Sequence, residues 1–321
     1  MADTVEEGET LDVAQIGDLI ESEFKPKTDA ARETIRRAVT TLAREAVKEG
    51  EVDPSDSTAT IKFLLKNLDD QLTKAVNEII HHEDFQKLEG SWRGLQYMVS
   101  NTETDEQLKI RVLNISKKEI AKLLKKYKGT AWEQSPLFKK LYEEEYGTPG
   151  GEPYGCIVGD FEFDHSAPDV QILQGLSQIA AAAHTPFIAA ASPRLMNMDS
   201  WQELSNPSDV NKLFTSPEYA PWRSLRESED ARYMGLTLPR FLSRLPYGAT
   251  TNPVDDFDFE EVVDNDQKNF TWANSAYAMG ANVTRSFKLY GWCSQIRGVE
   301  SGGSVEGLPC YTFPTDDGGV D

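Results

Sequence analysis

A chain of 321 residues is longer than one small domain needs, and it is ample for a sizeable core plus an accessory region. Its formal net charge of −20 makes nucleic acid and anionic membrane surfaces poor partners, because both are bound through clustered Lys and Arg. The three cysteines include no Cys-x-x-Cys pair, so neither a disulfide framework nor a zinc site is indicated. No stretch approaches 18 consecutive apolar residues. We therefore expect a cytoplasmic protein that does not insert into a membrane.

The N-terminal end is strongly acidic: residues 1–24 carry eight carboxylates and no basic residue. Within it, Leu11–Phe24 has an apolar stripe at helical spacing, and Pro26 ends the pattern. The stripe consists of Val13, Ile16, Leu19, Ile20 and Phe24. This pattern predicts a short amphipathic helix with nothing obvious in the sequence to pack on.

Two longer helices follow. The first is predicted over Thr28–Glu49 and ends at Gly50, and the second begins near Ser57 after a break at Glu51–Asp56. The second helix carries a long apolar stripe, made of Ile61, Leu64, Leu65, Leu68, Leu72, Val76 and Ile79. It either continues or bends into the next segment. We divide the chain accordingly into an acidic helical segment, residues 1–56, and a body, residues 57–321.

The run Phe85–Val99 has the pattern of a packing surface rather than of a site of chemistry. Phe85, Leu88, Trp92, Leu95 and Val99 are spaced three or four residues apart and share one helix face. The run also contains Gly90 and Gly94, although a glycine inside a helix costs about 1 kcal/mol relative to alanine. The two glycines predict that another backbone or a large ring comes very close to this helix.

From about residue 108 strands alternate with helices. We predict a half-buried strand over Leu108–Ile115 and a Lys-rich helix over 117–128. A strand–helix–strand unit follows over Cys156–Phe163, Pro168–Ala183 and Phe187–Ala191, and short helices are predicted near Trp222 and Tyr233. The fold class is therefore mixed α/β, with a helical N-terminal region followed by a mixed β-sheet domain and packed helices.

One cluster has the composition of a catalytic or metal site. Asp160, Glu162 and Asp164 alternate with phenylalanines, and His165 follows, so a divalent metal or a glycosidase-like acid pair is conceivable. A strand end with a polar face followed by a capped helix explains the same residues without chemistry. We favour the structural interpretation and predict no catalytic, cofactor or metal site. The alternative is a cytoplasmic metal-dependent or carbohydrate-active hydrolase that uses Asp160, Glu162 and His165.

The run Phe85–Val99 strongly resembles the signature of the large subunit of the type VI secretion contractile sheath, the TssC/VipB family. The residues that carry this resemblance are Phe85, Gly90, Trp92, Arg93, Gly94 and Leu95. Four further segments share it, so that it covers the chain from about Phe63 onward: Gly159–His165, Pro186–Ser192, Gly235–Arg240 and Phe313–Asp316.

The resemblance implies a structural protein and not an enzyme. Members of the TssC/VipB family pair with a small sheath subunit of the TssB/VipA family, and the heterodimers stack into a helical cylinder around an inner tube protein. Contraction of that cylinder drives the tube and its effectors outward. Relatives also carry an N-terminal helix that is recognised by the sheath-recycling AAA+ ATPase of the ClpV family. By this resemblance, Val13, Ile16, Leu19, Ile20 and Phe24 are expected to bind the ATPase.

One departure from the family pattern concerns the C-terminus. Relatives of this kind continue well beyond Phe313–Asp317, whereas this sequence stops at Asp321. In the family, the later part supplies the tube-facing domain and the strand exchange between neighbouring subunits. The resemblance therefore implies that residues 1–321 alone do not assemble into a sheath.

Overall fold

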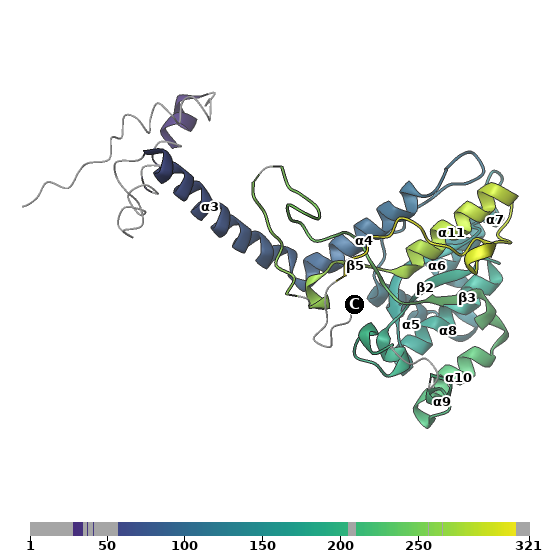
Figure 1. The fold of residues 1–321 in the computed structure, drawn as a ribbon. Coiled ribbons are helices and arrows are strands. Elements are labelled where there is room, and N and C mark those ends of the chain that lie inside the picture. Colours follow the sequence, from purple (N-terminus) through teal and green to yellow (C-terminus); the bar gives the residue numbers. More distant parts are fainter. Residues whose placement is uncertain are drawn as a thin grey trace, which may run out of the picture. The chain divides into compact units, whose positions relative to one another are not determined.

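The computed structural model describes residues 28–34, 37, 41, 57–204, 210–255, 257–264 and 266–312, and Figure 1 draws its fold. Residues 29–34 are helical. The predicted helix over Leu11–Phe24 and most of the one over Thr28–Glu49 lie outside the described residues. The α-helices from residue 57 onward are α3 Ser57–Ile80, α4 Glu83–Ser100, α5 Lys117–Lys126, α6 Pro136–Phe138, α7 Glu144–Tyr146, α8 Ala167–Ala182, α9 Val210–Leu213, α10 Ala220–Glu227 and α11 Ser275–Tyr290.

The chain forms two compact units. The first comprises Met1–His81 and Pro246–Val263, and the second comprises His82–Leu245 and Asp264–Asp321. Helix α3 belongs to the first unit, and the other named helices and all the strands belong to the second. The division that the sequence suggested at residue 56 concerns a segment that is mostly outside the described residues, so it stays a prediction.

The second unit is built on a small parallel sheet. Strands β1 Ile157–Phe163, β2 Phe187–Ala191 and β3 Met234–Thr237 lie in that order, and both pairings are parallel. A separate antiparallel pair joins β4 Phe241–Leu242 to β5 Trp272–Ala273. Parallel and antiparallel pairings thus occur in different sheets. Helices make up most of the remaining regular structure, so the predicted mixed α/β class is confirmed.

Helices cover both faces of the parallel sheet (Figure 1). On one face, α8 packs with α10 over a core that includes Phe163, Leu173 and Ile179, each almost completely buried. On the other face lies α11, where Gly280 is so close to Val158 that an added Cβ atom would lie 3.0 Å from its side chain. Small residues in β2, which reads Phe-Ile-Ala-Ala-Ala and is buried throughout, leave room for helices on both sides.

Several predicted elements are confirmed. Strand β2 has the predicted bounds, β1 begins one residue later than predicted, and α8 begins and ends one residue earlier than predicted. Helix α5 begins at the predicted residue because Ser116 and Glu119 form a capping box, with the Ser116 N–H donating to the Glu119 carboxylate at 2.8 Å. The predicted short helices near Trp222 and Tyr233 are α10 and a 3₁₀ turn over Glu229–Tyr233.

The predicted strand over Leu108–Ile115 is wrong. Alternating sequence is not enough for a strand, which needs a neighbour to complete its hydrogen bonds, and no described strand pairs with this segment. One of its side chains makes ion pairs instead: Arg111 pairs with Glu145 at 2.5 Å and with Glu152 at 2.7 Å. Val112 is left 70% exposed.

Candidate assembly surface

Helix α4 begins and ends where its sequence specifies. The His82 ring accepts a hydrogen bond from the Asp84 N–H at 3.2 Å, and Glu83 and Asp84 place negative charge in the first turn, where the helix dipole favours it. At the other end, the side-chain amide of Asn101 donates a hydrogen bond to the Tyr97 carbonyl at 2.8 Å. The run that the sequence predicted as a packing surface is therefore a single helix with two well-defined ends.

One face of α4 is set by glycines and lies inside the second unit. Gly90, Gly94 and Met98 are four residues apart and buried. At Gly90 the Trp272 carbonyl occupies the position that a side chain would need, and at Gly94 the Tyr277 ring does so. The close approach of a backbone and of a large ring, predicted from the two glycines, is present at these positions.

The apolar stripe of α4 lies on the opposite side of the helix and faces solvent. Two residues along a helix turn the side chain by about 200°, so Trp92 points away from the face that contains Gly90. Leu95 is partly buried, and the other four members of the stripe are exposed. Their exposed fractions are 38% for Phe85, 56% for Leu88, 65% for Trp92 and 46% for Val99.

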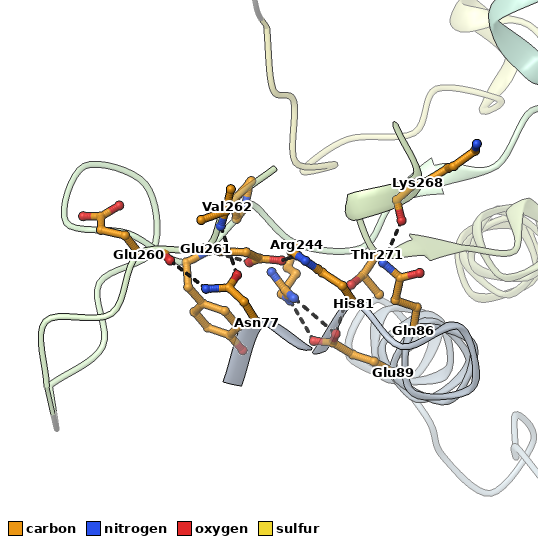
Figure 2. A network of polar contacts seen from close by, with 12 residues as sticks. Asn77, His81, Gln86, Glu89, Arg244, Glu260, Glu261, Val262, Lys268 and Thr271 are labelled. Carbon is orange, nitrogen blue, oxygen red and sulfur yellow. Dashed lines mark hydrogen bonds and ion pairs between the residues drawn. The ribbon is translucent and has the colours of Figure 1, made fainter. Parts of the chain in front are cut away.

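A carboxylate on α4 ties together three parts of the second unit that are distant in sequence (Figure 2). Glu89 accepts hydrogen bonds from Arg244 Nε at 2.7 Å and from Thr271 Oγ1 at 3.0 Å, and it also pairs with Arg93 at 2.6 Å. Gln86, one turn earlier, donates to the Lys268 carbonyl at 2.8 Å. These contacts hold the glycine face of α4 against the chain around β5.

The Glu89 ion pair is shielded from water. The side chain of Arg244 is 5% exposed and that of Glu89 is 12% exposed. Burial alone would raise the pKa of Glu89, but the hydrogen bonds and positive charges of Arg244 and Arg93 outweigh it and lower the pKa below the ordinary value. The carboxylate is therefore ionised in the folded protein. Sequence reasoning missed this residue, because a glutamate in an amphipathic helix usually belongs to a solvated face.

The first unit has its own exposed apolar stripe on α3. Leu65, Leu68, Leu72 and Ile79 are exposed there. Asn77, on the same helix, fixes the segment 246–263 by accepting from the Val262 N–H at 3.0 Å and donating to the Glu260 carbonyl at 3.1 Å (Figure 2). His81, which follows the end of α3, has its Nε2 atom 3.3 Å from a carboxylate oxygen of Glu261.

Of the three proposed hydrolase residues, Asp160 and Glu162 lie close enough to interact, but His165 does not join them. Burial, followed by the nearby Asp160, raises the pKa of Tyr277, and Arg240 and Lys117 contribute positive charge near Glu162. His165 makes its contacts elsewhere: its ring stacks on the buried Tyr219 at 4.2 Å, and its Nδ1 lies 3.0 Å from the Arg194 carbonyl. Among the described residues, no three His, Cys, Asp or Glu side chains are grouped as a metal site requires.

The structure distributes the other predicted site residues as follows. Gly90 and Gly94 form the inner face of α4, Arg93 and Leu95 are partly buried, and Phe85 and Trp92 are exposed. The predicted ATPase-binding set, Val13, Ile16, Leu19, Ile20 and Phe24, lies outside the described residues. Within the part of the chain that is described, no helix is long and apolar enough to cross a membrane.

Comparison with known proteins shows the family of the chain. Residues 62–321 match the family VipB, described as EvpB/VC_A0108, tail sheath N-terminal domain. The chain is also 63% identical over 313 residues to the type VI secretion system sheath protein TssC1 of Pseudomonas aeruginosa. That match covers 97% of this chain and 63% of the length of the relative. The chain therefore belongs to the VipB/TssC family of type VI secretion sheath proteins.

Proposed function

We propose that this chain is a structural subunit of a cytoplasmic contractile sheath and works by binding other proteins. It pairs with a small sheath subunit of the TssB/VipA family, and the heterodimers polymerise around an inner tube protein. Contraction of the polymer then drives the tube and its effectors outward. The energy of such a motion resides in contacts between subunits that have two alternative arrangements, so no catalytic residue is required.

The observation that carries this proposal is the exposed stripe of α4, made of Phe85, Leu88, Trp92 and Val99. Its helix is locked into the second unit by the opposite face, so the stripe is presented on a rigid element rather than on a loop. Large apolar side chains grouped on one exposed face mark interaction surfaces. Covering these side chains is worth about 1–2 kcal/mol each, which is enough for several to anchor a stable interface.

We assign the stripe of α4, and separately that of α3, to the small sheath subunit. In helix-in-groove binding, apolar side chains three or four residues apart on a helix contact the partner, and both stripes have this spacing. On α3 the described members are Leu65, Leu68, Leu72 and Ile79. An amphipathic helix or groove of the partner that presents apolar side chains at the same spacing is the expected cover.

Co-purification of the two sheath subunits tests the assignment. Trp92→Ser is expected to reduce recovery of the small subunit, because Trp92 is the most exposed member of the stripe. Trp292→Ser is the matched control, since Trp292 is 68% exposed, but it follows α11 and lies outside the stripe. Both variants should unfold at the wild-type temperature. Equal recovery of the small subunit with Trp92→Ser and wild type would overturn the assignment.

A further inference from the structure

Strand β1 and helix α11 pack against each other in a register that three contacts define. Asn274 donates to the Phe161 carbonyl at 3.2 Å, Tyr277 lies near Asp160, and Gly280 lies against Val158. From Asn274 to Gly280 the residue number rises along α11, whereas the number of the contacting residue in β1 falls from 161 to 158. The two elements therefore run antiparallel.

Continuing this register places Cys156 opposite the next turn of α11, at Val283. Successive strand side chains alternate between faces, so Cys156 points to the same side as Val158, which is the side covered by α11. Cys156 is partly buried and lies one residue before β1.

Cys293 reaches the same turn of α11 from the other direction. After Gly291 ends the helix in the left-handed conformation, the chain folds back along α11. Ser286 holds this return, donating to the Trp292 carbonyl at 3.2 Å and accepting from the Gln295 N–H at 3.1 Å. The Cys293 thiol lies 3.8 Å from the Val283 carbonyl. Both thiols are thus at the level of Val283, and both are reduced in this structure.

We propose that Cys156 and Cys293 are a reversible thiol pair that a low-molecular-weight disulfide, such as glutathione disulfide, converts to an intramolecular disulfide. The Cys293 thiolate attacks the glutathione disulfide, forms a mixed disulfide and releases one glutathione thiolate. The Cys156 thiolate then attacks the Cys293 sulfur and releases the second glutathione. Two protein thiols are oxidised, and one glutathione disulfide is reduced to two glutathiones. The product joins the start of β1 to the segment that follows α11.

The environments of the two thiols set this order. Cys293 is exposed, whereas Cys156 is partly covered. Burial, followed by the proximity of Cys293, raises the pKa of Cys156 to about 12. Burial also raises the pKa of Cys293, but its thiol remains accessible to a soluble oxidant. Because Cys293 is the more accessible of the two thiols, it meets the oxidant first, and Cys156 completes the disulfide.

Oxidation of the whole 321-residue chain with glutathione disulfide, followed by non-reducing digestion and mass spectrometry, tests the proposal. Cys310 is also exposed and serves as the internal comparison. The peptide linking Cys156 to Cys293 should exceed the one linking Cys156 to Cys310 by at least about tenfold in the folded chain, and this preference should disappear in urea, because proximity is created by the fold. Dithiothreitol should reverse the link.

Two variants complete the test. Cys310→Ser should form the same link as the wild type. Cys156→Ser should accumulate Cys293 as a stable mixed disulfide with glutathione, because the second thiol is missing. If Cys293 of the wild type also remains glutathionylated while Cys156 stays reduced, or if the link forms between two molecules, the proposal is wrong.

Discussion

The main-chain carbonyl of Trp272 occupies the space that a side chain at position 90 would need, which makes Gly90 a requirement of the fold. The carbonyl belongs to the backbone of β5, so it has less freedom to move than a side chain would. The glycine that looks unfavourable in an isolated helix is therefore the residue that allows α4 and β5 to touch.

Gly90→Ala is expected to destabilise the second unit by about 2–3 kcal/mol, because the added methyl group forces α4 away from β5. Unfolding in urea measures the loss. Gly155→Ala is the matched control: a Cβ atom there would have no neighbour within 4 Å, and its φ does not lie in the left-handed region. Equal destabilisation by the two substitutions would show that the contact with Trp272 is not responsible for the loss.

Glu89→Gln is expected to cost about 3 kcal/mol at neutral pH, because it removes the negative charge that pairs with the buried Arg244 side chain. Glu83→Gln is the control on the same helix, where the exposed carboxylate pairs with Lys87 at 2.6 Å, and it should destabilise the protein much less than Glu89→Gln does. Chemical unfolding of both variants gives the comparison.

The effect of Glu89→Gln should also depend on pH. The folded-state pKa of Glu89 is below its ordinary value of 4.5, so its ionised form stabilises the fold above that value. This contribution is lost as the pH falls through the lower, folded-state pKa. The difference in unfolding free energy between wild type and Glu89→Gln should therefore be constant from pH 8 to about pH 6 and should shrink below about pH 4.5. A difference that stays constant down to pH 3 would exclude a charge effect.

Asn77→Ala should release the segment 246–263 from α3 within the first unit. Its amide makes two hydrogen bonds to this segment, to the Glu260 carbonyl and from the Val262 N–H, and alanine makes neither. Hydrogen exchange at Val262 should accelerate by at least about tenfold if the lost bond is worth 1.4 kcal/mol or more. Asn67→Ala, which removes an exposed contact to Gln71 on the same helix, should leave that rate unchanged.

The N-terminal residues allow a binding prediction from sequence alone. A peptide of residues 8–27 should bind the N-terminal domain of a ClpV-family ATPase through Val13, Ile16, Leu19, Ile20 and Phe24. Affinity should be modest, because ordering about 14 residues offsets much of the roughly 10 kcal/mol from burying five apolar side chains. Titration calorimetry measures it. Binding that survives Ile16→Asp combined with Ile20→Asp would contradict the prediction.

Local patterns predicted the elements whose information is local. Strand β2 is a short apolar run between turn signals, and α5 carries its own capping box, so both were found close to their observed bounds. The segment Leu108–Ile115 has a strand pattern without a strand partner, and pairing partners are not encoded locally. The burial of α4 could not be predicted from local sequence either. The sequence showed the stripe of α4 and its glycines, but which of the two faces is buried depends on Trp272 and Tyr277.

The separation in sequence between α4 and its packing partners also has a consequence during synthesis. Glu89 and Thr271 are 182 residues apart, and translation at about 5–20 residues per second needs roughly 10–40 s to cover that distance. For this interval the nascent chain has α4 without the residues that cover its glycine face, so both faces of the helix are open to the cell. A chaperone that binds apolar helices would therefore meet α4 before the second unit is able to close.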